Sequence, residues 1–435
     1  MIRYIFITTA LLTLNIQSPA QSVSLDFPHF AGQEYHFWAF RGEKRDTIAS
    51  GKLDEHGRGK LVLPDRMKGH RGMTQWMLVN GGGLDIIFAG EERFSVSCPE
   101  AEPSEESITY TGSRENVYLY PRFRRQQDIL GKADAMRIAA EAYNDNPELL
   151  SFFDTELQKQ ARAYNRLQEE TAVNGLYAAR FAQIADISRG LPTVFTADQQ
   201  LTDSLMKDFI LNKLDMETLY TSGHWDNVLQ QFTDRYIYDE KVQRQFIPDA
   251  IRLLNRTQSG EAYAALAENV IIACEKQNWY DREIELAFFL LNDDRIKQPE
   301  GKTAVLYTLL KVRKGGKAPA LTQGTLPATK TILAFYDSGC GTCTGQMGRL
   351  AEMYPRLKAQ GYEVVSLSSD SDKGAFDAYA ENLPWESKYC DLEGYAGKDF
   401  RNYGIMGTPT FYLLDAEGII QGRYAQVEDI PGAGE

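Results

Sequence analysis

Two cysteines separated by two residues are the feature of this sequence with the clearest chemical meaning. The tetrapeptide Cys340-Gly341-Thr342-Cys343 follows an apolar, β-prone run at 331–336 and precedes a helix-like stretch at 344–358. Two thiols at this spacing, on a turn from strand to helix, can close a small disulfide and open it again. This segment, called here the cysteine motif, therefore indicates thiol-disulfide redox chemistry.

The same spacing also occurs in zinc sites, but the rest of the sequence disfavours a metal. No second Cys or His pair lies near the cysteine motif, and all five histidines precede residue 225. We therefore expect no metal and no cofactor. The three remaining cysteines lie far apart, so we expect small buried hydrophobes rather than a disulfide scaffold, and leave open a disulfide between two of them. They are Cys98, Cys274 and Cys390.

The segment 316–435 alternates strand and helix patterns around the cysteine motif. Helices between successive strands require parallel pairing with right-handed crossovers, whereas the closing hairpin adds antiparallel strands. The pattern predicts a mixed α/β domain that presents the cysteine motif after its first strand. The expected strands are 331–336, 362–368, 410–414 and 419–424, and the expected helices are 344–358, 373–382 and 396–403.

Two further domains precede this one, so the whole chain is predicted to be multidomain α+β. Residues 22–111 show short alternating apolar runs separated by turn signals, which is typical of a β-sandwich. Residues 112–311 carry apolar residues at three- and four-residue spacing and predict an α-helical domain of about eight to ten helices. Gly315-Gly316-Lys317-Ala318-Pro319 is a linker between the second and third domains.

The first residues and the overall charge bear on the compartment. Arg3, the apolar run 4–14 and the small residue Ala20 follow the order of a cleaved secretory signal, so residues 1–20 are predicted to be a signal peptide. The formal net charge is −13, and the sequence contains no long block of Lys and Arg. Nucleic acid is therefore not an expected partner. We expect an exported, periplasmic protein without a stable membrane anchor.

The C-terminal segment closely resembles the thioredoxin superfamily, in particular the TlpA-like exported thiol-disulfide oxidoreductases. The similarity runs through several motifs in the family's order, which makes it more specific than the cysteine motif alone. The β-rich and α-helical regions also resemble the poorly characterised front portions of some exported members, with a similar junction at 112–116. The matching C-terminal segments are 316–319, 335–336, 340–343, 364–370, 403–410 and 415–418.

The resemblance implies a thioredoxin-like fold and a role for each site residue. Cys340 would be the exposed nucleophile at a helix N-terminus, where free backbone N–H groups stabilise a thiolate. Cys343 would be the shielded resolving thiol. Pro409 would be a cis-proline facing the disulfide, and Thr408 before it would pair with an extended substrate segment. The implied partners are cysteine-containing envelope proteins and a membrane electron donor.

The sequence departs from the family's pattern at several positions. Gly339 replaces the usual Trp before the first cysteine, and Ala334 and Gln346 stand where different members have an acid. Asp337 or Glu363 could replace that proton acceptor, or water could. The Gly-Thr dipeptide holds no cation, so we expect a moderately reducing or intermediate couple. The final helix usual in thioredoxins has no obvious sequence here, so one sheet face would be thinly covered or covered by another domain.

Two other functions remain alternatives to a thiol-disulfide oxidoreductase. A thiol peroxidase would share the fold, but Asp337 stands where that group has its active-site Thr. A non-catalytic envelope binding protein would use the front domains and merely carry a thioredoxin-like module. The oxidoreductase explains the cysteine motif and the Thr408-Pro409 pair together, and is the function that we expect.

Overall fold

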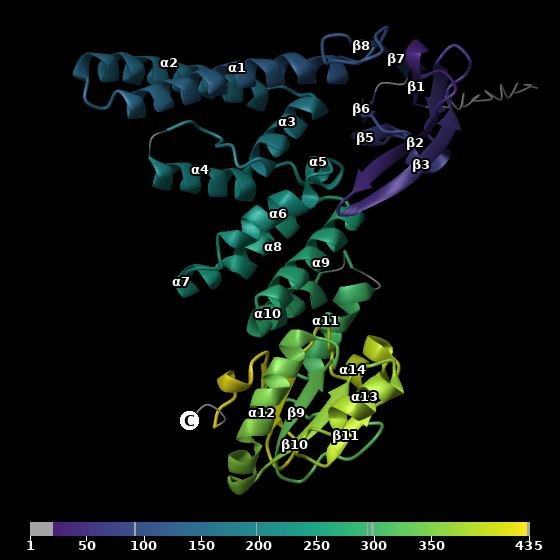
Figure 1. The fold of residues 1–435 in the computed structure, drawn as a ribbon, viewed down its shortest axis with the longest axis vertical. Coiled ribbons are helices and arrows are strands. Elements are labelled where there is room, and N and C mark those ends of the chain that lie inside the picture. Colours follow the sequence, from purple (N-terminus) through teal and green to yellow (C-terminus); the bar gives the residue numbers. More distant parts are fainter. Residues whose placement is uncertain (1–20, 91–92, 197, 294, 297–299, 433–435) are drawn as a thin grey trace, which may run out of the picture. The chain divides into compact units, whose positions relative to one another are not determined.

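The computed structural model describes residues 21–435 apart from 91–92, 197, 294, 297–299 and 433–435. The predicted signal peptide, residues 1–20, lies outside the described residues. The chain divides after Val228 into two compact units, which are described separately below (Figure 1). The predicted domain boundaries at 111 and 311 remain predictions.

The first unit begins with two four-stranded sheets that share one hydrophobic core, as predicted for a β-sandwich. In β2 the inward residues Tyr35, Phe37 and Ala39 alternate with more exposed ones, because successive side chains of a strand point to opposite faces. The first sheet has the order β4-β1-β7-β8, with β1 (Ser22–Asp26), β4 (Arg58–Val62), β7 (Arg93–Ser97) and β8 (Thr109–Thr111). The second has the order β3-β2-β5-β6, with β2 (Glu34–Arg41), β3 (Lys44–Lys52), β5 (Arg71–Leu78) and β6 (Gly83–Ala89).

Helices complete the first unit, and the first of them is joined to a sheet by a buried side chain. Asn116 donates to the Ile87 carbonyl and accepts from the Ile87 N–H, so α1 is fixed beside β6. The helix α6 crosses the division between the units. The helices are α1 (Arg114–Ala142), α2 (Pro147–Ala172), α3 (Tyr177–Ser188), α4 (Gln199–Asn212), α5 (Met216–Tyr220) and α6 (Trp225–Asp234).

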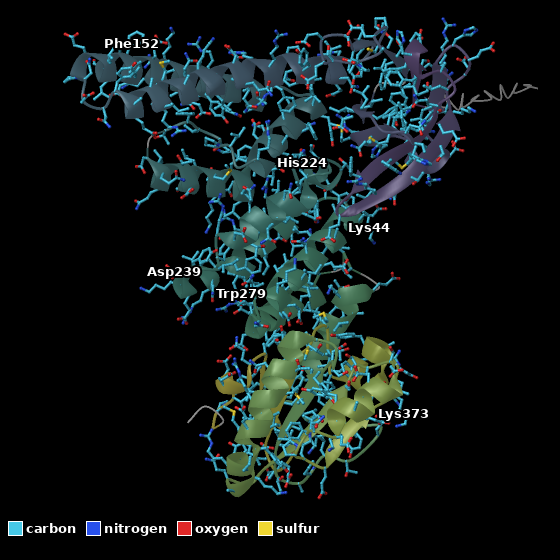
Figure 2. The ribbon with its side chains drawn as sticks, viewed as in Figure 1. Lys44, Phe152, His224, Asp239, Trp279 and Lys373 are labelled. Atoms are coloured by element: carbon cyan, nitrogen blue, oxygen red, sulfur yellow. The ribbon has the colours of Figure 1, made fainter. Side chains whose placement is uncertain are left out.

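The second unit starts with a group of helices. Trp279, labelled in Figure 2, precedes α10 and packs edge-on against Phe246 of α8, with ring centroids 5.1 Å apart. The helices are α7 (Glu240–Gln243), α8 (Phe246–Arg256), α9 (Gly260–Lys276), α10 (Tyr280–Leu291) and α11 (Gly301–Lys311).

A five-stranded mixed sheet follows, with the order β11-β10-β9-β12-β13. β9 to β11 are parallel, and the closing hairpin of β12 and β13 is antiparallel, as predicted. The edge strand β11 was not predicted. The strands are β9 (Lys330–Tyr336), β10 (Tyr362–Ser368), β11 (Ser387–Cys390), β12 (Thr410–Leu414) and β13 (Ile420–Tyr424), and the helices are α12 (Gly341–Ala359), α13 (Lys373–Ala380) and α14 (Lys398–Asn402).

Both faces of this sheet are covered by other segments of the second unit. On the α12 face, Val427 and Ile430 from the segment after β13 are buried against the core. On the opposite face, Leu309 and Val312, at the end of α11 and just after it, pack with Phe335 and Tyr412. Apolar side chains at the end of α11 and just after it therefore share a hydrophobic core with the sheet and shield this face from solvent.

Arg423 of β13 adds a buried ionic contact between the sheet and these helices. Its guanidinium donates to Glu283 of α10 at 2.9 Å and to Glu275 of α9 at 3.1 Å. It also lies over the Tyr280 ring, 4.0 Å from the centroid. The Arg423 and Glu283 side chains are 9% and 0% exposed, so this contact is shielded from solvent.

Candidate functional site

The cysteine motif lies at the carboxyl edge of the sheet, where β9 ends and α12 begins. Cys340 is the N-cap residue of α12, in extended backbone conformation, and is partly exposed. Cys343 lies one turn further along and is fully buried in the core beneath the helix. Both are free thiols in this structure. The arrangement presents one sulfur to a partner and shields the other.

The two thiols have opposite electrostatic environments. Hydrogen bonding from the Cys343 backbone N–H and thiol lowers the pKa of Cys340, as expected at a helix N-terminus. Burial raises the pKa of Cys343 to about 11. Near neutral pH the exposed sulfur is therefore the one favoured as a thiolate, which is the nucleophilic form.

Thr408 and Pro409 lie beside the cysteine motif, because β12 runs antiparallel to β9. Thr410 pairs with Phe335, so the two residues before Thr410 adjoin the end of β9. The Thr408–Pro409 peptide bond is cis, as predicted. Hydrogen bonding by the Thr408 hydroxyl lowers the pKa of Cys343 and so opposes the effect of burial. The structure thus brings all four predicted site residues to the same end of the sheet.

Tyr395 is a site residue that the sequence reasoning missed. It lies in a single turn at Gly394–Ala396, and its hydroxyl is 2.8 Å from the Thr408 hydroxyl. Burial raises the pKa of Tyr395, and the charges of Cys343, Asp337 and Cys340 also raise it. An exposed aromatic residue in a polar loop carries no sequence signal for such a position.

The two acids that could replace the family's proton acceptor, Asp337 and Glu363, lie near opposite ends of the central strand β9. Asp337 follows β9 directly and accepts hydrogen bonds from the Gly339 N–H at 2.8 Å and the Ser369 hydroxyl at 3.0 Å. Glu363 pairs in register with Thr331, at the far end of β9. Glu363 is therefore excluded by its position, whereas Asp337 is near the motif but already accepts two hydrogen bonds.

Gln346 has a structural role. Its side-chain oxygen accepts a hydrogen bond of 2.8 Å from the Val427 N–H, and the residue is 9% exposed. This bond holds the terminal segment against α12. A carboxylate here would accept the same bond but would add a buried charge, which is costly without a cation beside it.

The remaining cysteines lie apart from the cysteine motif in the sequence, and none is paired. Cys98 and Cys274 are buried, as predicted. Cys390 is only half-buried, because it ends the edge strand β11, and its thiol donates to the Asp370 carbonyl at 3.2 Å. The open alternative of a disulfide among these three residues does not apply in this structure.

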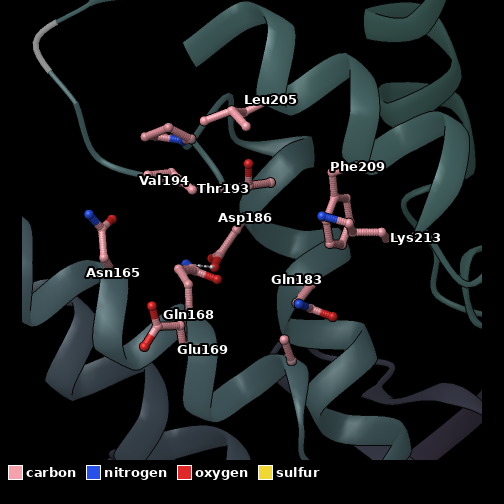
Figure 3. A pocket seen from close by; sticks show the side chains of 12 residues that line it. Asn165, Gln168, Glu169, Gln183, Asp186, Thr193, Val194, Leu205, Phe209 and Lys213 are labelled. Atoms are coloured by element: carbon pink, nitrogen blue, oxygen red, sulfur yellow. Dashed lines mark hydrogen bonds between the residues drawn. The ribbon is translucent and has the colours of Figure 1, made fainter. Parts of the chain in front are cut away.

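A pocket of about 290 Å³ lies among helices of the first unit (Figure 3). Its most buried acid, Asp186, accepts from Arg122 at 2.5 and 3.2 Å, from Arg189 at 2.8 Å and from Gln168 at 3.0 Å. Four donors saturate this carboxylate, so it stabilises the helices and has no free lone pair for a reaction.

Neither a metal cluster nor a membrane-spanning helix was found in the described part of the chain. No group of three or more His, Cys, Asp or Glu side chains there could hold a metal ion. No helix among the described residues is both long and apolar enough to cross a bilayer.

Comparison with known proteins points to the same region. Residues 329–420 match a thioredoxin-like family model. Nucleoredoxin of Danio rerio is 34% identical over 96 residues, which are 22% of this chain and 23% of that protein. Thiol-disulfide oxidoreductase ResA of Bacillus thuringiensis is 27% identical over 87 residues, 20% of this chain and 49% of that protein. Thiol:disulfide interchange protein DsbE of Escherichia coli is 30% identical over 111 residues, 25% of this chain and 54% of that protein.

These matches cover about half or less of each relative's own length. The segment matched by the family model, residues 329–420, contains the cysteine motif and most of the five-stranded sheet. The C-terminal part of this chain is therefore a thioredoxin-like domain, similar in sequence to thiol-disulfide oxidoreductases.

Proposed function

We propose that this chain is an exported thiol-disulfide oxidoreductase that exchanges disulfides with protein cysteines through Cys340 and Cys343. One observation carries the proposal. A partly exposed thiol of lowered pKa caps a helix N-terminus, and a fully buried thiol of raised pKa lies one turn below it. This asymmetry separates a nucleophile from a resolving thiol.

In the reducing direction the reaction proceeds in two exchanges. The Cys340 thiolate attacks one sulfur of a substrate disulfide, forms a mixed disulfide and releases the other substrate sulfur as a thiolate, which takes a proton from water. Cys343 then loses its proton and attacks the Cys340 sulfur. The Cys340–Cys343 bond forms, the mixed disulfide breaks, and the second substrate thiolate leaves. The substrate gains two electrons, and the motif loses them.

Thr408 and Pro409 are the proposed substrate contacts. They adjoin the end of β9 and lie next to the cysteine motif, where an extended substrate segment could pair with the Thr408 backbone. This position supports recognition of unfolded or extended protein segments.

The couple is proposed to be moderately reducing or intermediate. No Lys, Arg or His stands between the two cysteines, and the nearby Asp337 charge raises the pKa of Cys340, which limits stabilisation of the reduced thiolate form. Titration against glutathione and dithiothreitol buffers should place the potential between thioredoxin and protein disulfide isomerase, about −270 to −180 mV. A potential near that of strong oxidants, about −120 mV, would contradict the proposal.

The proposed location is the periplasm, where the partners would be cysteine-containing envelope proteins and a membrane electron donor. The order of charge, apolar run and small residue at 1–20 supports export. Expression with the native N-terminus, followed by cell fractionation and N-terminal sequencing, should give a protein that begins at Gln21. Uncleaved protein in the cytoplasmic fraction would contradict this location.

Reduction of insulin disulfides tests the activity itself. The wild-type chain should accelerate insulin precipitation by dithiothreitol, and Cys340→Ser should abolish that acceleration. Cys390→Ser is the matched control, because it removes the other partly exposed thiol and should retain activity. Consumption of hydrogen peroxide at a comparable rate would favour the thiol peroxidase instead.

A further inference from the structure

Two large hydrophobic side chains of the thioredoxin-like domain are exposed, and both lie in one short loop. Leu392 and Tyr395 are 39% and 45% exposed, and among the described residues of 316–435 no other large hydrophobic side chain is as open to solvent. Single exposed apolar residues are ordinary on a protein surface, whereas a cluster of them marks a site of interaction. We call the segment 391–397, which follows β11, the apolar loop.

The apolar loop contacts two parts of the proposed substrate site. The Tyr395 hydroxyl lies 2.8 Å from the hydroxyl of Thr408, which is a proposed substrate contact. Gly394 packs closely against Ser369, since a Cβ on Gly394 would lie 3.5 Å from the Ser369 carbonyl oxygen. Ser369 in turn donates to the carboxylate of Asp337 at 3.0 Å, in the turn that leads into the cysteine motif. The exposed side chains are therefore continuous with the substrate site.

Contacts within the domain hold the apolar loop in one conformation. Asp391 accepts a backbone N–H of the loop at 3.0 Å and packs over Gly397, where a Cβ would clash with its carboxylate. The Tyr395 ring packs edge-on against Phe400, with ring centroids 5.7 Å apart. Leu392 has a φ of 65°, a left-handed conformation that a leucine rarely adopts. A loop fixed in this way loses little conformational freedom when an apolar group docks on it.

We infer that Leu392 and Tyr395 select substrate segments that carry an apolar side chain close to their cysteine. The inference rests on the proposed function and deepens it by naming the substrate class. The extended segment pairs with the Thr408 backbone, and its apolar side chain packs on the apolar loop. Cysteine and large apolar residues are buried in most folded proteins, so a disulfide with apolar neighbours is accessible mainly in an unfolded chain. Unfolded protein chains are therefore preferred over glutathione disulfide, which offers no apolar side chain.

Symmetric peptide disulfides test this preference, because attack on either sulfur gives the same product. Each half is a short peptide with one cysteine, flanked either by leucine and phenylalanine or by serine and glutamine. The full chain is used with Cys343→Ser and Cys390→Ser, so that the Cys340 thiolate displaces one half as a thiolate and keeps the other as a mixed disulfide. Mass spectrometry follows the adduct, and the measured quantity is the ratio of the second-order rate constants for the apolar and polar peptides.

The protein with an intact apolar loop should react on the order of tenfold faster with the apolar peptide, because one side chain is partly buried in the encounter. Tyr395→Ala and Leu392→Asn should each lower this ratio to about two- to threefold, and asparagine tolerates the positive φ at position 392. Tyr395→Phe keeps the ring and should retain most of the preference. Tyr238→Ala is the matched control, because Tyr238 is 92% exposed between α6 and α7, and it should leave the ratio unchanged.

The outcomes separate this inference from the proposed function. No adduct on Cys340 with either peptide contradicts the proposed function. Adducts that form with both peptides at equal rates overturn only the apolar selection, and so does a ratio that is unchanged in both Tyr395→Ala and Leu392→Asn. A dimer in analytical ultracentrifugation that both variants dissolve, without a change in the ratio, also overturns the inference and assigns the apolar loop to contact with a second copy of the chain.

Discussion

The buried contact between Arg423 and two glutamates provides the sharpest prediction about stability. We consider Arg423→Met, which keeps an apolar side chain of similar length and removes the charge. The variant loses charge-assisted hydrogen bonds of 2.9 Å to Glu283 and 3.1 Å to Glu275, and the stacking on Tyr280 at 4.0 Å. It leaves two acidic groups whose side chains are 0% and 14% exposed.

The magnitude follows from which of the two acids keeps a charge. Removing one partner of a buried ion pair costs about 3–5 kcal/mol. Burial and the neighbouring Glu275 charge raise the pKa of Glu283 to about 9, although the Arg423 charge lowers it, so Glu283 is neutral at pH 7 and one bare charge remains on Glu275. We therefore expect Arg423→Met to lower the free energy of unfolding of the second unit by about 3 kcal/mol.

Hydrogen exchange in increasing guanidinium chloride, followed by mass spectrometry of peptides from β9 to β13, reports on the second unit alone. Arg349→Met is the matched control, because Arg349 pairs with Glu428 on the surface with side chains 57% and 36% exposed. Such a pair contributes about 0–1 kcal/mol. An Arg423→Met effect no larger than that of Arg349→Met would refute the reasoning.

Three further predictions concern single side chains. Alkylation by iodoacetamide should modify Cys340 with a pH midpoint below the ordinary thiol value of about 8.5, because its pKa is lowered, and should leave Cys343 unmodified until the pH approaches 11; equal rates at both thiols would argue against this. Since the pKa of Glu283 is raised to about 9 in the folded state, its contribution to stability is complete below about pH 4.3 and is lost as the pH rises toward 9. The free energy of unfolding, measured by denaturation between pH 5 and 9, should therefore decline in the wild type and decline less in Glu283→Gln. An equal decline in both proteins would contradict this prediction. Glu115 accepts the N–H groups of Tyr177 at 3.3 Å and Ala178 at 2.8 Å, so Glu115→Ala should destabilise the first unit by about 1–3 kcal/mol, measured by exchange of α3 peptides, whereas a loss below about 0.5 kcal/mol would exclude this capping role.

The sequence was most informative where apolar runs coincide with buried strands. β10 and β12 have the predicted bounds, because each lies inside the sheet and nearly all of its residues are buried. β11 was missed, since its four residues Ser-Lys-Tyr-Cys are only half-buried at the edge of the sheet and show no alternation. Periodicity reports burial, and an edge strand has little of it.

The helices show the same limit for different reasons. α1 runs from Arg114 to Ala142 through Pro121 and many charged residues, so its sequence shows little apolar periodicity. In α3, within the predicted helical region, nine of the twelve residues are buried, so no polar face marks its helical period. Tertiary packing decides both cases.

The residues of the site also differ in how far the sequence alone predicts them. The cysteine motif and Thr408-Pro409 could be predicted because residue type and spacing carry their chemistry. Tyr395 and Arg423 could not, because their roles depend on partners brought together by the fold. A hydrogen bond across 13 residues or an ion pair across 140 residues leaves no local pattern in one sequence.

The order in which the two thiols react is the central claim of this account, and trapping tests it most directly. Reduced Cys343→Ser protein is mixed with a disulfide-containing protein substrate, quenched with acid and analysed by peptide mass spectrometry. We predict a stable mixed disulfide on Cys340, none in Cys340→Ser, and none in the wild type once Cys343 has resolved it. A substrate adduct on Cys390, or on Cys343 in the Cys340→Ser protein at the same rate, would contradict the account.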